Sequence, residues 1–172
     1  ISDYLLRTCM IGVFFMPTLF MHFIVKFLEL SGKSIFIFFN YAISLFFSLF
    51  VYTTFYALNS EPYLIFHYWL KANILCTLEI IHFVVIVLFS FYLMLKAFSN
   101  AKGIRRNQLL YIIIGTGVGY LCGAINFLSW YRIPIPPFLN IFITFYVVSV
   151  AYAIIKYNLM DIRLAVTKLS IF

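Results

Sequence analysis

Charged residues are scarce in this sequence of 172 residues: lysine, arginine, aspartate and glutamate together make up only 10% of it. Soluble domains carry about 25% charged residues, so the chain lacks the polar surface that a water-soluble globule needs. With 65% hydrophobic residues, the same scarcity excludes a disordered chain. Acidic residues are rarest, five against twelve lysines and arginines. The basic residues are scattered between apolar stretches, however, which argues against a nucleic-acid partner.

Cysteine is scarce as well. Cys9, Cys76 and Cys122 are far apart and embedded in apolar sequence, which excludes a disulfide framework or a zinc-binding spacing. A strict alternation of polar and apolar residues is also missing, which argues against a membrane β-barrel. The sequence starts at Ile1 without an initiator methionine and stops at Phe172 in mid-pattern, so we expect it to be part of a longer protein.

Long apolar runs are what the sequence has in abundance. A membrane helix needs about 20 mostly apolar residues to cross a hydrocarbon core ~30 Å thick. Five stretches meet this requirement, at residues 4–28, 34–58, 69–98, 108–131 and 137–157. We therefore predict an all-α fold, a polytopic membrane helix bundle over residues 1–157, located in the inner cell membrane. Residues 158–172 would begin a cytoplasmic signalling helix or linker.

The distribution of basic residues predicts the orientation of this bundle. Nine of the twelve lysines and arginines lie in the segments around residues 26–33, 96–106 and 156–168, which fall on one side of the membrane. The positive-inside rule then places the C-terminus in the cytoplasm and the N-terminus outside. Aromatic residues cluster on the outer side and suit an interfacial belt, with a ligand-stacking role as the alternative: Tyr63, Phe66, Tyr68, Trp69, Trp130 and Tyr131.

Glycines line one face of the fourth predicted span. Gly115, Gly119 and Gly123 are spaced by four, so they share a helix face and allow a neighbouring backbone to approach closely. A nucleotide-binding loop is excluded because no strand precedes these glycines. Asn126 lies near the same face, and we predict that it forms an interhelical hydrogen bond.

The third predicted span carries a ridge of polar residues. Asn73, Cys76, Glu79 and His82 recur every three residues along an apolar helix. A carboxylate within the membrane is costly, so Glu79 should face the bundle and find a partner, for which His82 lies one turn away. Three interpretations stay open, namely a structural hydrogen-bonded pair, a pair that responds to protons or a ligand, and a metal site.

The outer face is formed by residues 59–67 and by the proline-rich turn at residues 132–137. Glu61, His67, Trp130 and Arg132 are candidates for a shallow ligand pocket there. The alternative is that the prolines only make a stiff turn between helices. The sequence contains no catalytic serine elbow, Cys/His pair, phosphate loop or paired carboxylates. We therefore predict no active site in this segment, and no cofactor.

The last third of the chain resembles a known family. Arg105-Arg-Asn-Gln-Leu-Leu-Tyr111 opens a glycine-containing span, Ile133-Pro-Ile-Pro-Pro137 follows, and Ala151-Tyr-Ala-Ile-Ile-Lys-Tyr-Asn-Leu-Met-Asp-Ile-Arg163 closes the last span. This succession resembles the N-terminal seven-helix membrane region of bacterial sensor histidine kinases and related signalling proteins. The resemblance implies two further helices upstream and a cytoplasmic output domain downstream. No phosphotransfer motif is present, so no catalytic residue is carried over.

Apolar residues near the C-terminus have the spacing of a helix–helix contact stripe. Leu159, Ile162, Val166 and Leu169 are spaced by three, four and three, as at the contact positions of a parallel dimeric coiled coil. Asp161 matches the junction signature of the family. We expect these five residues to transmit a signal in a homodimer; a tail lying along the membrane surface would use the same residues.

Three functions follow from these features. The leading hypothesis is the membrane input region of a bacterial two-component signalling protein, which relays a stimulus through the last helix. The second is a small integral membrane subunit that packs against other subunits. The third is a transporter fragment with Glu79 and His82 on a proton path, although no internal repeat supports it.

Overall fold

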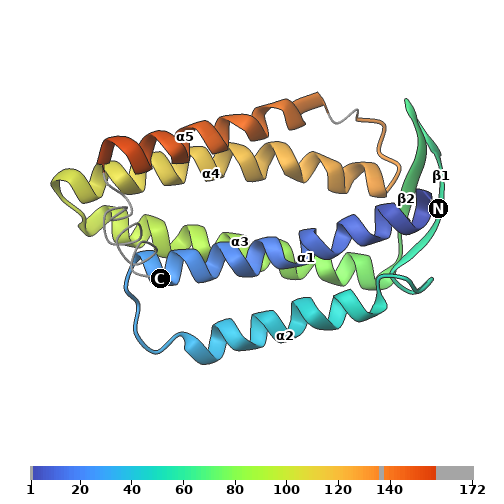
Figure 1. Cartoon of the computed structure of the whole chain (residues 1–172), viewed down its shortest axis with the longest axis horizontal. Helices are drawn as coiled ribbons and strands as arrows, with labels where there is room; N and C mark the ends of the chain where they lie inside the picture. The colour runs from blue at the N-terminus through green and yellow to red at the C-terminus, as the bar shows by residue number, and fades with distance from the viewer. Residues whose placement is uncertain (1, 136–137, 158–172) are drawn as a thin grey trace, which may run out of the picture. The chain divides into compact units, whose positions relative to one another are not determined.

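The computed structural model describes residues 2–135 and 138–157, and this part is mostly helical (Figure 1). In chain order the elements are α1 (Ser2–Phe27), α2 (Ser34–Phe50), β1 (Ala57–Tyr63), β2 (Phe66–Ala72), α3 (Ile74–Asn100), α4 (Gly103–Trp130), the short 3-10 helix η1 (Phe138–Phe142) and α5 (Ile143–Tyr157). The prediction of a helical chain is confirmed in this coarse form.

Three helices are long and apolar enough to cross a membrane. These are α1, α3 and α4, over Asp3–Phe27, Ile74–Asn100 and Gly103–Trp130. Helix α2 is apolar but has 17 residues, which at 1.5 Å per residue cover about 26 Å, less than the ~30 Å of a hydrocarbon core. Helix α5 has 15 residues. The five predicted spans are therefore three long helices and two shorter apolar ones.

A β-hairpin that was not predicted from the sequence separates α2 from α3. Strands β1 and β2 pair antiparallel, with Ala57 opposite Ala72 and Tyr63 opposite Phe66. The second predicted span was wrong beyond Phe50, where α2 ends, and the third was wrong to begin at Trp69, which lies in β2. The predicted spans were too long because a hydropathy average does not distinguish apolar residues in a strand from apolar residues in a helix.

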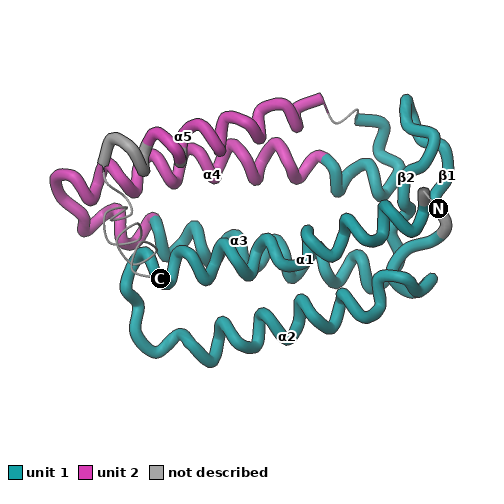
Figure 2. Tube along the Cα trace, viewed as in Figure 1, with its two compact units in different colours: residues 1–94, 126–137 teal, residues 95–125, 138–172 magenta. Residues whose placement is uncertain are grey.

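The described chain divides into two compact units (Figure 2). Unit 1 contains residues 1–94 and 126–137, which include α1, α2, the hairpin and most of α3. Unit 2 contains residues 95–125 and 138–172, which include most of α4 together with η1 and α5. Helix α4 contributes to both units, because its last turn belongs to unit 1.

The core of unit 1 is formed where its three helices pack together. Met21 and Val25 of α1 contact Ile37 of α2 and Ile86 of α3. Helix α1 contains Pro17, which has no N–H to donate and so interrupts the helical hydrogen bonds. Beside the proline, Ser44 of α2 donates a hydrogen bond of 2.9 Å to the carbonyl of Phe14. This bond ties the two helices together at the interruption.

Candidate functional site in the helical core

Glu79 is the central group of the candidate site. It lies on α3 with 1% of its surface exposed, and neither carboxylate oxygen has a hydrogen-bond partner among the described residues. Burying a carboxyl group without a partner is unfavourable, and such groups are rare in folded proteins. Glu79 is therefore an exception among buried carboxyl groups, and helix packing alone does not explain its presence.

The expected bond between Glu79 and His82 is not formed. Nε2 of His82 lies 3.1 Å from Oδ1 of Asn40 on α2 instead. Residues three apart on a helix point about 60° away from each other, so one side chain can face the core while the other faces a neighbouring helix. Here Glu79 takes the first position, and the half-buried His82 takes the second, beside the ring of Phe47.

A polar layer that includes His82, three residues after Glu79, joins the three helices of unit 1. Thr18 of α1 and Ser44 of α2 share a hydrogen bond of 2.9 Å between their hydroxyl groups. Asn40, four residues before Ser44, carries the bond to His82 of α3. Thr18, Asn40 and Ser44 were not among the residues predicted from the sequence. The signal was the four-residue spacing of Asn40, Ser44 and Ser48 on one face of an apolar helix.

Asn73 lies outside this layer, because it precedes the first residue of α3. Its side chain accepts a bond from the N–H of Ile74 and donates one to the carbonyl of Thr54, both at 2.8 Å. The predicted ridge therefore loses Asn73, which fastens the start of the helix. Asn126 is half-buried on α4, and its interhelical bond stays a prediction.

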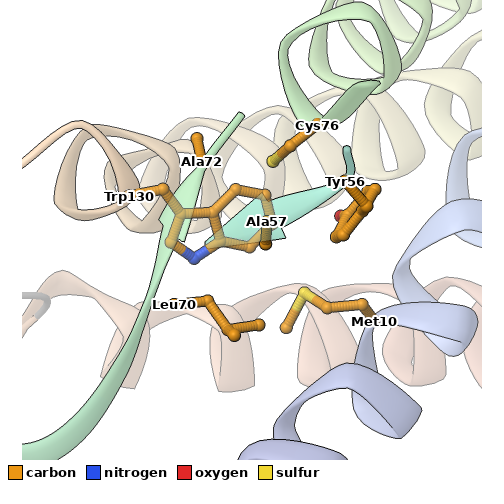
Figure 3. A pocket seen from close by; sticks show the side chains of 7 residues that line it. All are labelled: Met10, Tyr56, Ala57, Leu70, Ala72, Cys76 and Trp130. Carbon is orange, nitrogen blue, oxygen red and sulfur yellow. The ribbon is translucent and has the colours of Figure 1, made fainter. Parts of the chain in front are cut away.

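The thiol of Cys76 faces a small apolar pocket under the hairpin (Figure 3). The pocket is too narrow to hold a water molecule, and its lining comes from α1, the hairpin, α3 and the end of α4: Met10, Tyr56, Ala57, Leu70, Ala72, Cys76 and Trp130. The hydroxyl of Tyr56 has no hydrogen-bond partner among the described residues. Burial raises the pKa of Tyr56 far above its usual value.

The outer-face candidates divide into three environments. Glu61 and Arg132 form an ion pair of 3.1 Å, and the guanidinium of Arg132 stacks on the ring of Tyr63 at 5.0 Å. Trp130 is 6% exposed and packs in the core under the hairpin, so the interfacial-belt interpretation is wrong for it. His67 is exposed on β2. The structure brings Glu61 and Arg132 together, and within the described chain neither of them forms a hydrogen bond or ion pair with the side chain of His67.

Arg7 is a functional candidate that sequence reasoning missed. It is a buried cation near the start of α1, with 3% of its surface exposed. Its Nε donates to Asp3 at 2.7 Å, and its two amino groups donate to the carbonyls of Val51, Thr53, Ala57 and Leu58 at 2.9–3.3 Å. All five N–H donors of the guanidinium are used, which only an arginine can provide.

Asp3 extends this arrangement to the hairpin. Its second oxygen accepts a bond of 3.1 Å from the backbone N–H of Ser60 in β1. Asp3 and Arg7 together fasten the start of α1 to the residue that follows α2 and to the first strand. The start of α1 lies beside the hairpin in Figure 1. We call this arrangement of Asp3 and Arg7 the latch. Its only signal in the sequence is an acidic and a basic residue four positions apart, which is a common pair on helices.

In unit 2 the predicted glycine face packs against α5. A Cβ atom added at Gly115 would lie 2.8 Å from Cβ of Ser149, and one at Gly119 would lie 3.0 Å from Cβ of Tyr146. Both positions therefore need glycine for the observed approach of the two helices. At Gly123 the nearest atom would lie 3.8 Å away, which is an ordinary contact.

The remaining predictions concern a metal and the C-terminal tail. In the ranges 2–135 and 138–157 no three His, Cys, Asp or Glu side chains gather as metal ligands. The transmission residues Leu159, Asp161, Ile162, Val166 and Leu169 lie outside the described residues.

Comparisons with protein families, with curated proteins and with solved structures find no match to this chain.

Proposed function

We propose that this chain is the membrane-embedded input region of a bacterial signal-transduction protein. In this proposal the state of the Glu79 carboxyl group is coupled to the packing of the helices, and the last helix relays the change to a cytoplasmic output domain. The resemblance of residues 105–168 to the membrane region of sensor histidine kinases supports the output half of the proposal.

The observation that carries the proposal is the burial of Glu79 without a hydrogen-bond partner among the described residues. An ionisable side chain inside a membrane helix is expensive and typically marks a functional position. Binding of a proton or a polar ligand group would give this carboxyl the partner it lacks. A stimulus of this kind shifts a conformational equilibrium only by its difference in affinity for the two states.

Two rival functions find less support. Gly115 and Gly119 already pack against α5 of the same chain, so this face is not needed for a partner subunit. A proton path through Glu79 and His82 would benefit from a direct hydrogen bond between them, and His82 is bonded to Asn40 instead.

The first experiment is the intact mass of the native polypeptide, combined with peptide mapping. We expect a chain much larger than 20.2 kDa, with soluble peptides that continue after Phe172. A mature chain that ends near Phe172 would overturn the proposal, because no output domain could then receive the signal.

The second experiment replaces Glu79 by glutamine in the complete protein and measures the basal activity of its output domain in lipid vesicles between pH 5 and 8. We expect a change of several-fold and a loss of pH response, with membrane insertion unaltered. Glu29→Gln is the matched control, because Glu29 is an exposed carboxylate after the end of α1. An E79Q variant with the wild-type output at every pH would rule out the sensing role of Glu79.

A further inference from the structure

The turn between α3 and α4 in unit 2 is a concentrated patch of positive charge. Lys96, Lys102 and Arg106 are exposed there, and the half-buried Arg105 donates to Gln108 at 3.4 Å. The described residues of unit 2, 95–125 and 138–157, contain no aspartate or glutamate. The ion pairs of Asp3 with Arg7 and of Glu61 with Arg132 both lie in unit 1.

Local hydrogen bonds build the turn that carries these cations. The side chains of Ser99 and Asn100 both donate to the carbonyl of Lys96, at 2.8 and 3.2 Å. Gly103 has a φ of 57°, a conformation that glycine adopts readily and that allows α4 to start directly after the turn. The guanidinium of Arg106 stacks on the ring of Phe98 at 5.0 Å, which fixes it on the side of α3.

Apolar side chains flank these cations. Leu95 is 53% exposed and Ile104 67% exposed, one on either side of the turn. A soluble anion would use only the charges, whereas an amphiphile with an anionic headgroup would use the charges and the apolar flanks together. Lysine and arginine near an anionic membrane surface each strengthen binding about fivefold.

We propose that the turn of Lys96, Lys102 and Arg106 is a binding site for the phosphate headgroup of an anionic phospholipid. The lipid phosphate would accept hydrogen bonds from the two ammonium groups and the guanidinium. Its acyl chains would lie along Leu95 and Ile104. This site does not depend on the proposed signalling function or on which end of the bundle faces the cytoplasm.

The test is native mass spectrometry of the purified chain in detergent with equal amounts of phosphatidylglycerol and phosphatidylcholine. The wild type should retain phosphatidylglycerol preferentially, and the triple variant K96Q/K102Q/R106Q should lose this preference by at least about tenfold. The matched control K26Q/K33Q/K71Q removes three positive charges from unit 1 and should keep the preference. An equal loss in both variants would overturn the proposal, because net charge would then explain the binding.

Two further arms keep the proposal testable if the triple variant does not fold. In the wild type, raising sodium chloride from 50 to 500 mM should weaken phosphatidylglycerol retention, because the Debye length falls from above 10 Å to about 4 Å. Inorganic phosphate at the lipid concentration should not displace the lipid. Retention insensitive to salt, or displacement by inorganic phosphate, would each contradict a phospholipid site.

Discussion

Nε of Arg7 lies 2.7 Å from a carboxylate oxygen of Asp3, and this partly buried pair holds together elements that are about 50 residues apart in the sequence. The other donors of Arg7 end on backbone carbonyls at the end of α2 and the start of β1. The last carbonyls of a helix have no intrahelical donor, and they carry the negative end of the helix dipole. A guanidinium at this position therefore meets a structural requirement that water meets at exposed helix ends.

Replacing Arg7 by alanine should destabilise the chain strongly. The change leaves Asp3 without its cation and removes the guanidinium donor from four backbone carbonyls, and the bonds to Val51 and Ala57 are buried. Leaving a buried acceptor without this donor costs about 1–3 kcal/mol for each group. Thermal unfolding in detergent, followed by circular dichroism, would measure the loss. Arg7→Lys should recover only part of the stability, since lysine has three donors where arginine has five.

The control for this prediction is Arg132→Ala. Its ion pair with Glu61 is open to solvent, with 59% of the glutamate side chain exposed. Exposed pairs contribute about 1 kcal/mol or less. Equal losses for the two alanine variants would show that the latch of Asp3 and Arg7 does not carry the stability assigned to it.

Substitution of the α4 glycines should follow the space beside each one. Gly115→Ala places a Cβ atom 2.8 Å from that of Ser149, so α5 must move, at a cost of about 1–3 kcal/mol. Gly12→Ala, which meets nothing within 4 Å, should be neutral or slightly stabilising. The same unfolding assay compares the two, and a Gly115→Ala variant as stable as Gly12→Ala would contradict the close packing.

The bond between Asn40 and His82 should appear as a coupling between α2 and α3. We expect a double-mutant cycle of Asn40→Ala and His82→Ala to give an interaction energy of about 0.5–1.5 kcal/mol, the range of hydrogen bonds between helices in membranes. Glu79→Ala combined with His82→Ala is the comparison, since these residues form no hydrogen bond. A larger coupling for the second pair would restore the original pairing hypothesis.

Because Tyr56 is buried, we expect the free energy of unfolding to decrease at alkaline pH. Its pKa is raised in the folded state because burial disfavours the phenolate, so the unfolded chain ionises first, near pH 10. Stability is therefore unaffected by this group below about pH 10 and decreases as the pH rises above that value. Chemical unfolding between pH 8 and 11.5 should show the decrease in the wild type.

Tyr56→Phe should remove this part of the alkaline loss. At neutral pH it should be neutral or mildly stabilising, because the hydroxyl has no hydrogen-bond partner among the described residues. Tyr68→Phe serves as the control, since Tyr68 is 55% exposed and should behave as the wild type does. An identical alkaline decrease in the wild type and in Tyr56→Phe would contradict the assignment.

Much of the helical architecture could be predicted from composition and hydropathy. Helices α1, α3 and α4 follow from apolar runs that are long enough to cross a bilayer. Gly115 and Gly119 indicated a closely packed helix face because a four-residue period brings residues together without any knowledge of the partner. The hairpin could not be predicted in this way, because its apolar residues extend the hydropathy of the helices on either side.

The sequence by itself determined which segments are apolar, where charge is concentrated, and that Glu79 stands alone as a carboxyl deep in a helical run. Tertiary structure decided the partners. In the folded chain His82 is hydrogen-bonded to Asn40, and Glu79 has no hydrogen bond within the described residues. Arg7 donates to backbone carbonyls just after α2 and in β1. Local spacing fixes which face of a helix a residue occupies, but its partner depends on which other element packs against that face.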